Sequence, residues 1–120
     1  MNLGDDMKED KLGNLSMELS VDVLNLCKKL KAQKETVISN QIGRSASSIC
    51  ANIAESKYAH GRADFIAKLQ IALKECSESE YWLELLIESG YYDDTTILDQ
   101  RVEIKKLLVS SINTAKSNQK

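Results

Sequence analysis

Apolar residues recur at intervals of three and four along most of the chain, which is the spacing of one face of an α-helix. Four such runs are separated by short polar segments that contain glycine or charged residues. The pattern predicts helices over about 15–32, 36–58, 63–89 and 95–116. Strands would need strict alternation of apolar and polar residues, so we expect none.

Each predicted helix carries an apolar stripe that we expect to face one shared core. In chain order the stripes comprise Leu19, Val23, Leu26 and Leu30; Ile38, Ile42, Ala46, Ile49 and Ile53; Phe65, Leu69, Leu73, Cys76, Leu83 and Ile87; and Leu98, Val102, Leu108 and Ile112. Short turns oblige neighbouring helices to run in opposite directions. The predicted fold is therefore all-α, an antiparallel up-down-up-down four-helix bundle.

Capping residues indicate where these helices begin and end. Asn14 or Ser16 can cap the first helix, and Asp94 or Thr95 can cap the last. Gly61 is predicted to adopt the left-handed conformation that ends the second helix.

The composition is that of one helical domain. The 120 residues contain no proline and five glycines, which favours long helices joined by short turns. We interpret residues 1–14 as a flexible polar lead, 15–116 as the bundle and 117–120 as a tail. No stretch has the roughly 20 apolar residues of a membrane span, so no membrane association is expected.

The residues that catalysis or metal binding would need are sparse. His60 is the single histidine, it lies in a predicted turn, and no Glu-x-x-His pair is present. Cys27, Cys50 and Cys76 lack C-x-x-C spacing, and their odd number in apolar contexts favours reduced thiols in a cytoplasmic protein. No glycine-rich phosphate loop occurs. We therefore expect no enzyme activity, no metal site and no cofactor.

A second stripe, of mostly small or uncharged polar residues, runs beside the apolar stripe of the second helix. Counting outward from the turn near residue 60 places Arg44 near Cys76 and Gln41 near Ser79 and Glu80 of the third helix. Both side chains are then within reach of Glu80 or Glu78. A carboxylate on an apolar face needs such a partner. The predicted buried polar network, which would fix the register of the two helices, comprises Gln41, Arg44, Ser48, Asn52, Glu55 and Glu80. A small-molecule site in the bundle core, around Arg44, Asn52 and Glu80, is an alternative interpretation.

Aromatic and basic residues indicate two kinds of partner. Aromatic side chains concentrate binding energy in protein interfaces, and the candidates are Tyr81, Trp82, Tyr91 and Tyr92. The candidate RNA contacts are Lys28, Lys29, Lys31, Lys34, Arg62, Lys105 and Lys106. The net charge is −2, however, and residues 63–90 contain six acids and two bases, a net −4. This balance is unlike that of a strongly basic nucleic-acid binder.

One long motif resembles a known family. It reads Gln41-x-x-Arg44-Ser45-Ala46-x-Ser48-Ile49-x-x-Asn52-Ile53-Ala54-Glu55, and is followed by Phe65, Ala72 and Glu80. It is similar to the bacterial four-helix-bundle proteins encoded in intervening sequences of 23S rRNA genes, a family that includes the accessory variability proteins of diversity-generating retroelements. The resemblance covers roughly residues 15–115 and implies an antiparallel four-helix bundle, often a homopentamer.

The resemblance also implies partners. These are other copies of the chain, and RNA, the ribosome or a reverse transcriptase. Retroelement members resemble basic adaptors, whereas this chain is acidic and has Ala32-Gln33-Lys34-Glu35 where family members commonly have Phe-Pro. We therefore expect a non-enzymatic, self-associating scaffold or adaptor. An RNA- or ribosome-binding accessory protein is the alternative.

Overall fold

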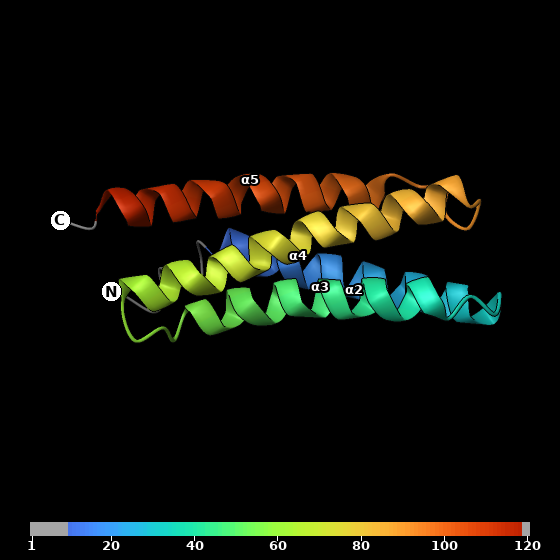
Figure 1. Ribbon diagram of the computed structural model, residues 1–120, viewed down its shortest axis with the longest axis horizontal. Helices are drawn as coiled ribbons and strands as arrows, with labels where there is room; N and C mark the ends of the chain where they lie inside the picture. The colour runs from blue at the N-terminus through green and yellow to red at the C-terminus, as the bar shows by residue number, and fades with distance from the viewer. Residues whose placement is uncertain (1–9, 119–120) are drawn as a thin grey trace.

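The computed structural model describes residues 10–118, so predictions for 1–9 and 119–120 lie outside the described residues. Four α-helices fill this range and run alternately in opposite directions (Figure 1). Their bounds are α2 Lys11–Ala32, α3 Val37–Ser56, α4 Arg62–Glu88 and α5 Thr96–Ser117. The bundle measures 50 × 25 × 21 Å. The predicted all-α four-helix fold is confirmed.

The helices pack at the four corners of the bundle. α2 and α4 each pack against both α3 and α5, so α2 and α4 occupy diagonal corners. Because chain direction alternates, these two diagonal helices run parallel to each other (Figure 1). None of the four helices within 10–118 is long and apolar enough to cross a membrane.

The core of the first half follows the predicted stripes closely. All four predicted residues of α2 are buried, and of the five in α3 only Ile38 is partly exposed. Each stripe is a narrow band at three- and four-residue spacing, so it fits between two neighbouring helices. Burial of this kind stabilises a side chain by about 1.5–3 kcal/mol.

The core of the second half departs from prediction in α5. Val102 was expected to face inward but is 37% exposed. The buried face instead follows Ile97, Arg101 and Ile104, a regular four-three spacing that contains a charged residue. In α4, Ile87 is half-buried and Leu86 takes the core position. Both departures are local, because Leu83 of α4 and Leu108 of α5 are buried as predicted.

The helix ends also differ from prediction. α2 begins four residues early, because Asp10 Oδ1 accepts a hydrogen bond from Gly13 N at 2.9 Å and caps the helix. Residues 11–14, predicted to belong to the polar lead, are therefore helical. Gly61 has φ 178°, which is extended, and precedes α4 rather than ending α3 in a left-handed turn. Among the glycines of residues 10–118, Gly90 has the left-handed conformation, with φ 81°, directly after α4.

Candidate functional site

Arg44 connects the middle of α3 to two acids of α4. Its Nη1 donates to Glu75 Oε2 at 2.9 Å, and its Nη2 donates to Glu78. Glu75 and Glu78 are three residues apart, so their carboxylates share one helix face. The hydrogen bond between Arg44 and Glu78 is the main reason that the pKa of the guanidinium is raised and that of the Glu78 carboxyl is lowered. Both charges are thus stabilised by the fold.

The remaining predicted network residues of α3 make local or exposed contacts. Asn52 Nδ2 donates to the Ser48 carbonyl at 2.9 Å and to the Ser48 hydroxyl at 3.2 Å, one turn earlier in the same helix. Glu55 accepts from Lys68 Nζ at 3.1 Å near the other end of the α3–α4 seam. Ion pairs at two separate levels, at Arg44 and at Glu55, therefore link α3 to α4.

Glu80 is not part of this group. It pairs with α5, where Arg101 Nη2 lies 3.2 Å from Glu80 Oε2. Gln41 contributes only its backbone carbonyl, which accepts from Ser45 Oγ at 3.0 Å. The structure therefore does not bring Arg44 and Glu80 together, and the small-molecule site predicted around them is not formed.

Arg101, like Glu75, is a buried charged residue that sequence reasoning missed. Its side chain is only 6% exposed, and its Nε and Nη1 have no hydrogen-bond partner within residues 10–118. The available signal was its place in the four-three stripe of α5. A charged residue in such a stripe is usually assigned to the surface, because burying an unpaired charge is costly.

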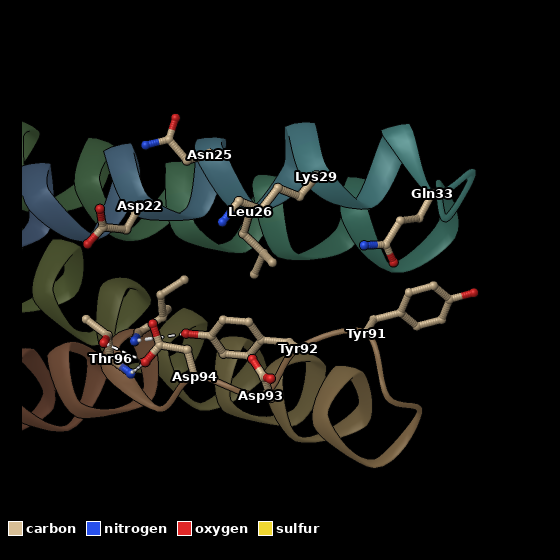
Figure 2. Close-up of a pocket in the computed structure, with 11 residues that line it drawn as sticks. Asp22, Asn25, Leu26, Lys29, Gln33, Tyr91, Tyr92, Asp93, Asp94 and Thr96 are labelled. Carbon is tan, nitrogen blue, oxygen red and sulfur yellow. Dashed lines mark hydrogen bonds between the residues drawn. The ribbon is translucent and has the colours of Figure 1, made fainter.

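A groove of about 440 Å³ lies between α2 and the segment that joins α4 to α5 (Figure 2). The Tyr92 ring lies in this groove, and its hydroxyl accepts a hydrogen bond from Ile97 N at 3.3 Å. Burial raises the pKa of the Tyr92 hydroxyl. Tyr91 also lines the groove, and its hydroxyl points outward (Figure 2). No group of three or more metal-ligating side chains occurs in the part of the chain that the structure describes.

The four candidate interface aromatics divide into two kinds. Trp82 and Tyr92 pack against the core, whereas Tyr81 and Tyr91 are 58% and 40% exposed. The rings of Tyr81 and Trp82 also pack edge to face, with centroids 5.0 Å apart and an interplanar angle of 71°. Of the four, Tyr81 offers the largest exposed fraction.

The candidate RNA contacts do not gather on one surface of a single chain. Lys28, Lys29, Lys31 and Lys34 are exposed at the α2–α3 end of the bundle. Arg62 begins α4 at the opposite end (Figure 1), where its guanidinium donates to the Asn118 carbonyl. The two α5 lysines, Lys105 and Lys106, are exposed between these ends.

An exposed apolar stripe on α2 was also missed. Met17, Val21 and Leu24 are 58%, 49% and 56% exposed, and their four-three spacing places them on one face of the helix. The signal was present in the sequence as a second apolar periodicity beside the core stripe. Periodicity alone does not tell which of two faces a neighbouring helix covers.

The four helices and their shared core form an antiparallel four-helix bundle. A search of curated proteins finds no match. The chain belongs to the family of 23S rRNA-intervening sequence proteins, which it matches over residues 8–110. The family resemblance predicted from the motif in α3 is confirmed.

A solved crystal structure shows the same fold. It is a protein with unknown function from the S23 ribosomal protein family of Bacteroides thetaiotaomicron. The two sequences are 50% identical, the TM-score is 0.82, and the match covers 84% of this chain and 97% of that chain.

Proposed function

We propose that the protein is a non-enzymatic helical scaffold or adaptor of the bacterial cytoplasm that associates with copies of itself. The exposed apolar stripe of Met17, Val21 and Leu24 carries the proposal. Isolated exposed apolar residues are ordinary, but several on one helix face favour a protein partner. The family resemblance suggests five subunits.

The polar residues support a structural role. Arg44 has both terminal nitrogens engaged by carboxylates of α4, and Glu80 is paired with Arg101. These contacts tie α3 to α4 and α4 to α5. Side chains that form ion pairs between helices in this way position the helices rather than a substrate.

Sedimentation velocity and light scattering of the full chain at micromolar concentration test the proposal. The chain mass is 13.4 kDa, and we expect a species several times larger, five times larger for a pentamer. A strictly monomeric species over this range would overturn it.

An RNA- or ribosome-binding accessory role is the second candidate. The observation in its favour is the group of exposed lysines between residues 28 and 34, at one end of the bundle. Lysines from several subunits would converge there if the copies lay side by side. Binding to structured RNA that weakens steeply with salt would support this role, and no binding at low salt would remove it. A reverse transcriptase is the protein partner that the resemblance to retroelement proteins suggests.

A further inference from the structure

We propose that α2 of one copy packs in parallel against α4 of the next copy. The inference rests on the proposed self-association and names the two surfaces that meet. Within residues 10–118, neither surface is covered by another helix of the same chain, and their charges are complementary.

The first surface, called the α2 stripe, consists of Met17, Val21, Leu24, Lys28 and Lys31. All five are exposed, and they follow a 4-3-4-3 spacing. This is the heptad spacing by which one helix packs along another. The stripe is apolar along its first two turns and basic toward the C-terminal end of α2.

The second surface, called the α4 stripe, consists of Gln70, Lys74, Ser77, Tyr81, Glu84 and Glu88. These residues are also all exposed and have the spacing 4-3-4-3-4. Tyr81 is its large apolar side chain, and its C-terminal end is acidic. Within residues 10–118, neither these two acids nor the two lysines of the α2 stripe form an ion pair.

Contacts with α3 show that the charged ends of the two stripes lie at the same level. Cys27 Sγ is 3.3 Å from the Ser39 carbonyl, and Arg44 pairs with Glu78. Ser39 is five residues from Arg44 toward the α2–α3 end. Because α4 runs opposite to α3, five residues in the same direction from Glu78 lead to Leu83, in the turn of α4 that contains Glu84. The lysines of the α2 stripe therefore share a level with the acids of the α4 stripe.

The position of the helices in the bundle sets how copies meet. α2 and α4 lie at diagonal corners and run parallel (Figure 1), so their exposed stripes face opposite sides of the molecule. Neighbours in the same orientation then bring lysines against acids and Leu24 against Tyr81. Two α2 stripes packed in parallel would instead bring lysines together. An interface between two different surfaces closes into a ring or extends as a filament.

Charge reversal separates this arrangement from other modes of association. The variants are Lys28→Glu/Lys31→Glu, Glu84→Lys/Glu88→Lys and the combination of all four. Complementary charge sets orientation and partner choice, so each reversed pair should raise the concentration for half-assembly by at least about tenfold. In the combined variant, the concentration for half-assembly should return close to the wild-type value.

A matched control carries Lys29→Glu/Lys106→Glu. It makes the same change in net charge as Lys28→Glu/Lys31→Glu, but at exposed lysines outside both stripes. Lys29 lines the groove beside Tyr92. This control should assemble as wild type does, and circular dichroism should show the same helix content in every variant.

Cross-linking provides an independent readout. Leu24→Cys/Tyr81→Cys in one chain should give a ladder of disulfide-linked multimers, whereas either single variant should not. A wild-type chain that is monomeric overturns both the proposed function and this interface. A wild-type assembly that is unaffected by charge reversal, or is not restored in the combined variant, overturns only the interface.

Discussion

The guanidinium of Arg44 on α3 lies 2.9 Å from the carboxylate of Glu75 on α4, whose side chain is only 11% exposed. Glu75 therefore depends on one cation from a neighbouring helix. A carboxylate that loses such a partner remains buried without compensation.

Arg44→Ala should destabilise the bundle by about 1–3 kcal/mol, the usual range for leaving a buried polar group unsatisfied. Lys68→Ala is the control, because its partner Glu55 is 58% exposed and can be solvated. That change should cost less than about 1 kcal/mol. Urea unfolding monitored by circular dichroism measures both, and equal losses would contradict the importance assigned to Glu75.

Stability should fall in acid partly through Glu78. Its folded-state pKa is lowered from 4.5, mainly by the hydrogen bond from Arg44. A group with a lowered folded pKa stabilises the protein fully above its unfolded pKa, and the contribution is lost as pH falls through the folded value. The urea midpoint of wild type should therefore decrease below about pH 4.5, and Glu78→Gln should decrease less steeply. Parallel curves for the two proteins would contradict the assignment.

The Glu80–Arg101 pair should respond asymmetrically to mutation. Arg101 is 6% exposed and Glu80 is 33% exposed. Glu80→Ala leaves a buried guanidinium unpaired and should cost about 3 kcal/mol, whereas Arg101→Met fills the same space and leaves a carboxylate that water can reach. Thermal unfolding at pH 7 should show the larger loss for Glu80→Ala. A larger loss for Arg101→Met would contradict the argument.

The cysteines should differ in reactivity. Burial raises the pKa of the Cys76 thiol to about 12, so almost no thiolate is present near neutral pH. Cys50 is only partly buried. Alkylation of the native protein followed by peptide mass spectrometry should find Cys50 modified well before Cys76, and denaturant should equalise the two. Equal rates without denaturant would show that the Cys76 site opens readily.

The two inter-helix glycines should tolerate alanine differently. Gly90 has φ 81°, where an L-residue is strained, so Gly90→Ala should cost about 1 kcal/mol. Gly61 has an extended backbone, and a Cβ there meets no atom within 4 Å. Gly61→Ala should therefore be neutral or slightly stabilising. Thermal unfolding of the two variants provides the comparison.

The sequence by itself determined the helices and most of the core. Strong three- and four-residue periodicity is a local property, so it can be seen without knowing any neighbour. The same periodicity, counted from one turn, placed Arg44 near Cys76 and within reach of Glu78 or Glu80, because two antiparallel helices joined by a short turn have little freedom of register.

Only the tertiary structure decided which faces became covered. Whether Arg101 or Val102 faces inward depends on how far α5 is rotated about its axis against α4. Successive side chains of a helix point in directions 100° apart, so the choice decides which of the two is buried. Glu80 therefore pairs with Arg101 of α5 and not with a residue of α3. For the same reason, the apolar stripe of Met17, Val21 and Leu24 was visible as a pattern, yet only packing left it exposed. Within residues 10–118, α3 and α5 are the helices that pack against α2, and they leave this face uncovered.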